Sequence, residues 1–221
     1  MSIKFPVHAM RRRQTVVIAN TSVFTALALI LTFVNTEIPF PLLPYLKFDL
    51  AEVPIMVLLL LMGPVPSLVA EIIGWVALSI ARGWVLGPAM KFLAVVPMIL
   101  GYWIGVVVVG RFFKGKRTGM VFAFGSVVGG ISRILAASLM NIVVLLWIAP
   151  EFLRFAGSML RALGYVTTSN QEVLVWTLLL TGVFNGIHVL VSAIPALAVI
   201  RGAAFKIPWV AQNAWIFERS H

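Results

Sequence analysis

Long stretches of apolar residues follow one another along most of the chain, separated by short polar or proline-rich breaks. A helix needs about 20 mainly apolar residues to cross the hydrocarbon layer of a membrane, and fewer where neighbouring helices enclose it. The pattern predicts an all-α integral membrane protein, a single domain over residues 1–221 with six transmembrane helices. The expected spans are 14–34, 51–62, 65–82, 88–109, 119–147 and 173–200.

The break after the first span, residues 35–50, carries Pro39, Pro41 and Pro44, which prevent a regular helix. The segment is nevertheless rich in large apolar side chains, which a solvated connector would not expose together. Two interpretations fit this pattern equally well. The segment is either a rigid lid over an outward-facing pocket or a piece of chain packed on the rim of the bundle.

Two later breaks also shape the expected topology. Gly63 and Pro64 force a tight reversal between the second and third spans. Residues 150–172 form a polar segment between the fifth and sixth spans, and the apolar spacing within 151–163 is typical of a helix. We expect that helix to cap one face of the bundle.

Composition and charge support the membrane interpretation. Hydrophobic residues make up 61% of the chain and charged residues 11%, which excludes a soluble enzyme and a disordered chain. With both termini in the cytoplasm, eleven of the 17 lysines and arginines lie on the cytoplasmic side, five lie outside and Arg133 lies within the membrane. This bias follows the positive-inside rule, so the net charge of +10 does not indicate nucleic-acid binding. The absence of cysteine excludes disulfides and thiolate metal sites.

Three polar residues stand out within the last two spans. Counted from the interface markers Trp147 and Trp176, Asn141 and Asn185 lie at roughly 9 and 14 Å below the outer boundary. His188 follows Asn185 by three residues, on the same helix face. These amide and imidazole groups can read the edge of a heterocycle, or they can hydrogen-bond neighbouring helices instead. The residue types alone leave both interpretations open.

Two opposite charges lie at nearly matching depth in the third and fifth spans. Glu71 is eleven residues below Arg82 and Arg133 is fourteen below Trp147, so their depths differ by about 5 Å. Because unpaired charges are costly in lipid, we expect a structural ion pair between Glu71 and Arg133. A role in substrate or proton handling is the alternative.

Several chemistries are absent from the sequence. It contains no phosphate-binding motif for ATP, no zinc-binding histidine pair and no serine-nucleophile elbow. His188 is the one histidine within an expected span, so no metal site is expected. A chain of this kind can still serve active transport if another subunit supplies the energy.

Five stretches carry recognisable motifs. Glu37-Ile-Pro-Phe-Pro, Tyr45-Leu-Lys-Phe-Asp-Leu-Ala-Glu-Val-Pro54 and Met62-Gly-Pro64 resemble the first loop and second helix of S components, the substrate-binding subunits of energy-coupling factor (ECF) vitamin transporters. Ile131-Ser-Arg-Ile134, which leads to Asn141, and Phe184-Asn-Gly-Ile-His188 resemble the fifth- and sixth-helix motifs of the riboflavin-specific branch. The resemblance covers nearly the whole chain.

This resemblance implies a membrane-embedded, high-affinity binding subunit whose outward-facing pocket is roofed by the first loop. The ligand would be riboflavin or FMN, bound without chemical change, and no cofactor or metal is implied. His188 stands where the riboflavin branch has a lysine, and a neutral imidazole brings no fixed positive charge. The residues implied to contact the substrate are Asn141, Asn185, His188, Glu37, Tyr45, Leu46, Lys47 and Asp49.

The same resemblance implies partners and a location. The chain would sit in a prokaryotic cell membrane and dock on a transmembrane T component through the small residues Ser22 and Ala26 of its first helix. Two partner ATPase subunits would hydrolyse ATP, so the chain itself would be no enzyme. An S component for another vitamin, such as pyridoxine, thiamine or queuosine, is one alternative. An intramembrane enzyme using Glu71, Arg133 and His188 is another.

Overall fold

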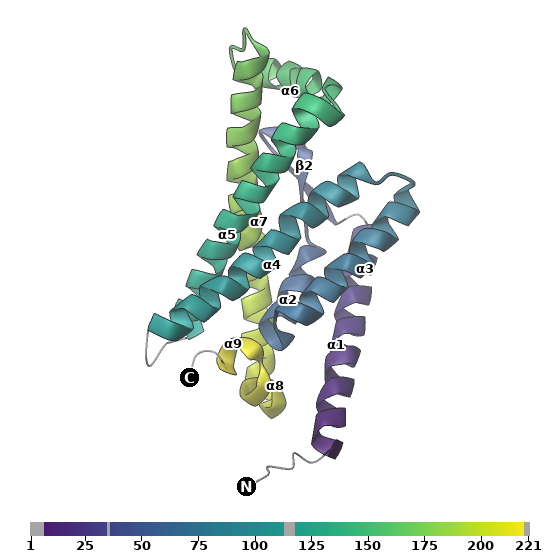
Figure 1. Ribbon diagram of the computed structural model, residues 1–221, viewed down its shortest axis with the longest axis vertical. Coiled ribbons are helices and arrows are strands. Elements are labelled where there is room, and N and C mark those ends of the chain that lie inside the picture. The colour runs from purple at the N-terminus through teal and green to yellow at the C-terminus, as the bar shows by residue number, and fades with distance from the viewer. Residues whose placement is uncertain (1–6, 35, 113–117, 219–221) are drawn as a thin grey trace.

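The computed structural model describes residues 7–34, 36–112 and 118–218, and shows a bundle of long helices with a small β-hairpin between them (Figure 1). The inner-side basic residues Lys4, Lys114, Lys116, Arg117 and Arg219 lie outside the described residues. The elements are α1 (Val7–Phe33), β1 (Glu37–Phe40), β2 (Leu43–Asp49), α2 (Glu52–Met62), α3 (Pro64–Arg82), α4 (Leu86–Phe112), α5 (Thr118–Val143), the π-helical turn η1 (Val144–Ile148), α6 (Glu151–Ala162), α7 (Asn170–Lys206), α8 (Pro208–Asn213) and α9 (Trp215–Glu218).

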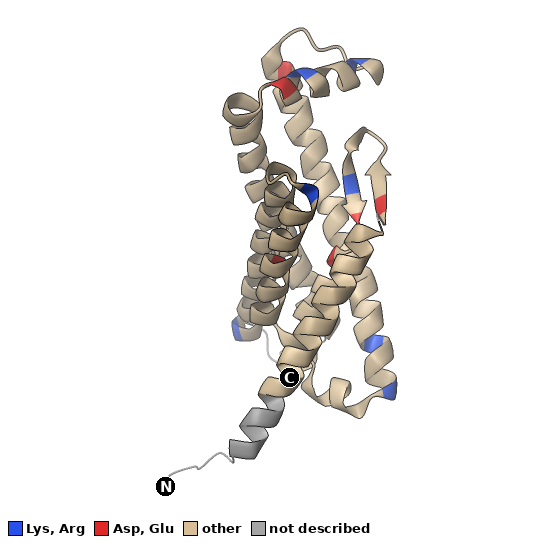
Figure 2. Cartoon of the chain, turned by 90° about the vertical axis from the view of Figure 1, so that its right-hand side faces the viewer, with Lys and Arg blue, Asp and Glu red and all other residues tan. Residues whose placement is uncertain are grey.

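Five helical segments of the described chain are long and apolar enough to cross a membrane. They are Gln14–Phe33, Pro64–Arg82, Leu86–Phe112, Thr118–Ile148 and Asn170–Lys206. The lateral surfaces of these helices carry few charges, which gather instead near the helix ends and the hairpin (Figure 2). The chain is therefore a multi-pass membrane protein.

The expected second span is a helix, but α2 is only 11 residues long and rises about 16 Å. That length covers about half of the hydrocarbon layer, so the structure does not confirm a sixth full crossing. Nine of the 11 residues are buried. Its continuous apolar run therefore reflects burial on all sides by protein and not contact with lipid.

The reversal after α2 occurs where the sequence predicted it. Gly63 ends the helix with φ at 91°, a left-handed conformation that favours glycine. Pro64 then begins α3 at a position where its missing N–H costs no helical hydrogen bond. Two short helices after α7, which the sequence did not indicate, close the bundle beneath this turn. The Trp215 ring of α9 lies 3.2 Å from the Cβ position of Gly63.

The segment after α1 corrects the all-α expectation, since β1 and β2 form an antiparallel two-stranded sheet. Glu37 pairs with Asp49 and Ile38 with Phe48, and the register shifts at Pro39. Proline is tolerated here because each strand has a free edge. A period-two pattern so short and interrupted by prolines was not separable from a loop.

We call the end of the bundle that carries the hairpin and α6 its outer end, and this end has its own hydrophobic cluster. Buried residues of the hairpin, Phe40, Leu43 and Phe48, pack there with Leu160 of α6 and Phe184 of α7. The predicted helix within 151–163 is confirmed as α6, which lies across the outer end of the bundle (Figure 1). The hairpin and α6 occupy the end opposite to the one where α1 begins and α7 ends (Figure 1).

Candidate functional site

A cavity of about 510 Å³ lies between the hairpin and the outer parts of α3 to α7. Such a volume suits a small-molecule ligand. All eight residues that the sequence singled out for substrate contact line this cavity. They are Glu37, Tyr45, Leu46, Lys47, Asp49, Asn141, Asn185 and His188. Of the two interpretations of residues 35–50, the hairpin both packs on α7 and roofs the cavity.

The floor of the cavity is a buried polar network centred on Arg133. Its Nη1 and Nη2 donate to the two carboxylate oxygens of Glu52, at 2.6 and 3.0 Å. Its Nε donates to Asn185 Oδ1 at 2.8 Å, and its Nη2 lies 3.0 Å from His188 Nδ1. Arg133 and Glu52 are only 2% and 1% exposed. The bidentate geometry compensates both charges where water is scarce.

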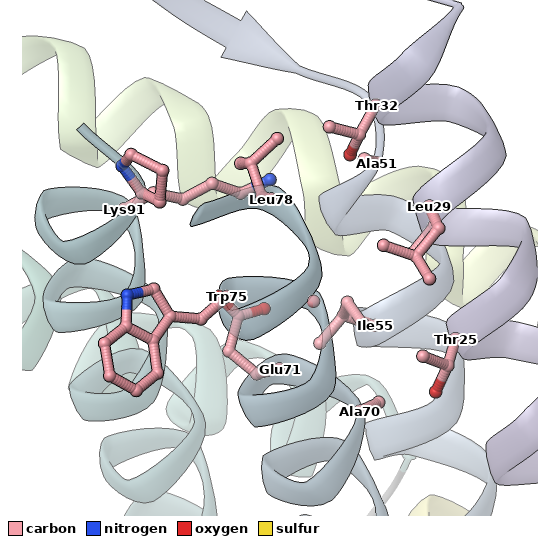
Figure 3. A pocket seen from close by; sticks show the side chains of 13 residues that line it. Thr25, Leu29, Thr32, Ala51, Ile55, Ala70, Glu71, Trp75, Leu78 and Lys91 are labelled. Atoms are coloured by element: carbon pink, nitrogen blue, oxygen red, sulfur yellow. The ribbon is translucent and has the colours of Figure 1, made fainter. Parts of the chain in front are cut away.

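The predicted ion pair between Glu71 and Arg133 is wrong, because Arg133 is bound to Glu52. Glu71 instead lines a smaller neighbouring cavity of about 30 Å³ between α1, α2, α3 and α4, which shares the lining residues Leu78, Pro88 and Lys91 with the first (Figure 3). Equal depth along two helices does not fix the direction in which each side chain points about its helix axis. Glu52, the first residue of the short helix α2, lies inside the bundle within reach of Arg133.

This separation also bears on the intramembrane-enzyme alternative. That function required Glu71, Arg133 and His188 to meet in one water-accessible cavity. Arg133 and His188 do meet, but Glu71 lines the other cavity. Within the described residues, no group of three or more histidines and carboxylates could hold a metal ion.

Ion pairs tie the hairpin to the surrounding helices at the cavity mouth. Glu37 on β1 binds Lys47 of β2 at 2.7 Å and Arg82 at the end of α3 at 3.2 Å. Partial burial would raise the pKa of Glu37, but the hydrogen bonds and positive charges of Lys47 and Arg82 outweigh it and lower this pKa below 4.5. At the same end of the hairpin, Asp49, the cross-strand partner of Glu37, pairs with Lys91 of α4.

The hairpin also makes direct contact with the cavity floor. The backbone N–H of Asp49 donates to His188 Nε2 at 3.2 Å. The Phe48 ring stacks on Phe184 with centroids 4.8 Å apart and meets the edge of the His188 ring at 5.4 Å. His188, almost one turn inward of Asn185 on α7, therefore connects the roof to the Arg133 network.

Asn141 differs from Asn185 in both position and bonding. Arg133 reaches Asn185 across two antiparallel helices, so Asn141, eight residues further along α5, lies about two turns nearer the mouth. The similar depth expected for the two asparagines is therefore wrong. Asn141 lines the cavity without a side-chain hydrogen bond to any described residue. It precedes the π-helical turn η1, a local widening of the helix that often occurs at functional sites.

Several lining residues were not singled out from the sequence. On one wall, α4 and the preceding loop contribute mainly apolar groups, including Trp84, Leu86 and Met90. On the other wall, the buried hydroxyl residues Thr181 and Thr177 stand about one and two turns outward of Asn185, respectively. Thr181 and Thr177 precede Asn185 by four and eight residues, which places all three on one helix face. This spacing could have identified the two threonines from the sequence. Ser22 and Ala26 lie outside the cavity and are exposed on the surface of α1.

Comparisons with known proteins bear on this site and its fold. No protein-family model matches the chain. The chain is 29% identical over 126 residues to the riboflavin transporter RibU of Staphylococcus aureus (strain TCH60). That match covers 57% of this chain and 62% of the relative's length. A solved structure, described as the S component of a bacterial ECF transporter, superposes with a TM-score of 0.63 at 22% identity.

The structural match covers 86% of this chain and 96% of the solved one. The chain has the fold of an S component. The resemblance inferred from the motifs is therefore confirmed at the level of the fold, with a riboflavin transporter among the similar sequences. In the S-component fold of this chain, the hairpin roofs the cavity and the Arg133 network forms its floor.

Proposed function

We propose that this chain is the substrate-binding subunit of an ECF-type importer and that it captures riboflavin without changing it chemically. The observation that carries the proposal is the roofed cavity of about 510 Å³, which unites every residue implied by the motifs. A concave, mostly apolar cavity with a few convergent polar groups is typical of a small-molecule binding site. The similarity to a riboflavin transporter supports the choice of ligand.

The two walls of the cavity match the two parts of riboflavin. Trp84, Leu86 and Met90 offer apolar surface to a flat fused-ring system. Asn141 and Thr181 offer amide and hydroxyl groups to ring carbonyls and to the hydroxyls of the ribityl chain. A ligand with one apolar face and a polyol chain therefore uses both walls.

The charges of the cavity favour riboflavin over FMN. Each cation that lines it already has a carboxylate partner: Lys47 and Arg82 share Glu37, Lys91 binds Asp49 and Arg133 binds Glu52. A phosphate deep in the cavity would need a cation without such a partner. Arg133 supplies the fixed positive charge that His188 lacks, but Glu52 neutralises it, so the floor suits a neutral ligand.

Transport would require partners, which we propose to be a T component and two ATPase subunits. Ser22 and Ala26 leave a low-relief exposed strip on α1, on which a transmembrane helix of the T component could pack closely. In this proposal both termini face the cytoplasm and the hairpin faces outward.

The ligand can be tested by titrating the purified protein with riboflavin and following the quenching of flavin fluorescence. We expect saturable quenching at micromolar protein. Asn141→Ala should weaken binding by about 1–2 kcal/mol, because the ligand would lose a hydrogen bond in a desolvated site. The matched control is Asn20→Ala, since Asn20 on α1 bonds its own helix at Val16 and lies outside the cavity. The absence of quenching would reject riboflavin as the ligand.

A further inference from the structure

Helix α7 presents a polar stripe to the cavity. Thr177, Thr181, Asn185 and His188 recur about once per turn, line the cavity and are each 4% exposed or less. Buried polar groups normally find a hydrogen-bond partner, and a group that lacks one is available to a ligand. The hydrogen bonds that the four side chains already make therefore distinguish those available to a ligand from those that are not.

The two inner residues of the stripe are largely occupied by the protein itself. Asn185 accepts a hydrogen bond from Arg133 Nε at Oδ1 and donates from Nδ2 to the Thr181 carbonyl at 2.9 Å. His188 Nδ1 faces Arg133 Nη2, and its Nε2 lies 3.2 Å from the Asp49 backbone nitrogen and 3.4 Å from Glu52 Oε1. A ligand that bonded directly to His188 would have to displace one of these contacts.

The two threonines differ in the hydrogen bonds that their hydroxyl groups make. Thr177 Oγ1 donates to the Val173 carbonyl at 2.7 Å, the usual way in which a threonine satisfies its hydroxyl within a helix. Thr21 and Thr25 on α1 do the same. The Thr181 hydroxyl makes no hydrogen bond to the described part of the chain, although its residue is 4% exposed and lines the cavity. The Thr181 hydroxyl is therefore available for a hydrogen bond with a ligand in the cavity.

The position of Thr181 indicates which part of the ligand it meets. Aromatic side chains gather around the mouth, where Trp84 follows α3, Tyr45 lies on β2 and Phe155 lies on α6. Thr181 lies further in, one turn outward of Asn185 and the charged floor. A fused-ring ligand that stacks at the mouth therefore directs its polyol chain inward, toward Thr181.

Resting on the proposed function, we propose that the Thr181 hydroxyl is the direct partner of a ribityl hydroxyl and distinguishes hydroxylated flavins from flavins without the chain. In this arrangement Asn185 and His188 are positioning residues. Asn185 fixes Arg133, and His188 joins the floor to the hairpin through Asp49.

The test compares Thr181→Val with Thr177→Val, which removes a hydroxyl from the same cavity wall but one already bonded to its own helix. Each variant is titrated with riboflavin and with lumiflavin, which has the same ring but no ribityl chain. Thr181→Val should weaken riboflavin binding by about tenfold and leave lumiflavin binding unchanged. Thr177→Val should stay within about twofold of the wild type for both ligands, and Thr181→Ser should restore riboflavin binding.

The outcomes separate this inference from the function on which it rests. Failure of the wild-type protein to bind riboflavin would overturn both. Riboflavin binding that is equal in Thr181→Val and Thr177→Val, or an equal loss for the two ligands in Thr181→Val, would overturn the assignment of Thr181 alone. As a positioning residue, Asn185 should behave differently: Asn185→Ala should weaken both ligands alike and also lower the unfolding temperature.

Discussion

Helix α5 meets α4 on one side and α7 on the other, and the two contacts differ in what fills the space between the helices. On the α4 side, glycines let the backbones touch. A Cβ atom on Gly129 would lie 2.9 Å from the Met98 carbonyl oxygen, and one on Gly101 would lie 2.3 Å from Ser132 Oγ. These separations are below van der Waals contact, so no larger residue fits without moving a helix.

On the α7 side the same helix presents Arg133, Ala137 and Asn141, all of which line the cavity. Glycines on α7 are not tightly enclosed here, since a Cβ atom on Gly182 would lie 3.8 Å from Ile134, an ordinary packing distance. The helices are held together at the floor by the buried polar network. The outer part of the contact is left open for a ligand.

Helix α5 contributes to stability on its α4 side and to binding on its α7 side. The α4–α5 contact has backbone against backbone and leaves little freedom for α5 to shift. The α5–α7 contact depends on a few charged and polar side chains, and losing one of them strands its partner in a buried site. Substitutions on the two sides should therefore fail in different ways.

The largest effect is expected on the polar side, at the floor. Arg133→Met leaves the Glu52 carboxylate buried without its cation and should lower the free energy of unfolding by about 3–5 kcal/mol. The double variant Arg133→Met/Glu52→Gln should recover part of that loss, because no unpaired charge is left. Denaturant unfolding of the detergent-solubilised protein measures both.

Glu71→Gln is the control for the double-mutant cycle of Arg133 and Glu52, since Glu71 lines the smaller cavity. Its coupling to Arg133→Met should be weaker than that of Glu52→Gln, which removes the direct partner of Arg133. Coupling between Glu71 and Arg133, together with none between Glu52 and Arg133, would contradict the network seen here.

A smaller effect is expected on the backbone-packed side. Gly129→Ala pushes a methyl group against the Met98 carbonyl and should destabilise the fold by about 1–3 kcal/mol. Gly182→Ala, the matched change on α7, has room for the methyl group and should be neutral or stabilising by about 0.5–1 kcal/mol. Thermal unfolding of the two variants in the same detergent compares them. Equal stability would mean that the α4–α5 contact is no tighter than the α5–α7 contact.

The fold was predictable where a single physical rule acts along the chain. The long spans follow from the hydrocarbon thickness, and the turn at Gly63 follows from the need for a left-handed conformation. The hairpin, α8 and α9 were missed because short elements owe their structure to tertiary contacts, such as the Trp215 ring against Gly63. The sixth crossing is not confirmed, because a helix buried in protein and a helix crossing lipid share the same apolar run.

For the site, motif resemblance grouped residues that the structure brings to one cavity, whereas pairwise bonding could not be predicted. Glu52 rather than Glu71 binds Arg133 because α2 starts inside the bundle, and helical rise gives depth but not direction. The free hydroxyl of Thr181 depends on which carbonyl groups its neighbours occupy, a property that the sequence does not show.

The smallest expected effect concerns the hairpin at the mouth of the cavity. Its clamp joins Glu37 to Lys47 and Arg82, and these cations lower the pKa of Glu37 below 4.5. A carboxylate with a lowered pKa contributes its full stabilisation above the ordinary pKa and loses it as the pH falls through the lowered value. The hairpin should therefore loosen on acidification and stay closed at neutral pH.

Because the chain has no cysteine, a single spin label can report this loosening from Ile38→Cys, an exposed position on β1. Label mobility should rise as the pH falls from about 6 to about 3, where glutamate titrates. Glu37→Gln removes the titrating group, so the label should be more mobile at neutral pH and show little further change. A label at the exposed Val166, beyond α6, is the control and should not respond. An unchanged pH response in Glu37→Gln would show that another group holds the hairpin, and that the mouth is as fixed as the α4–α5 contact.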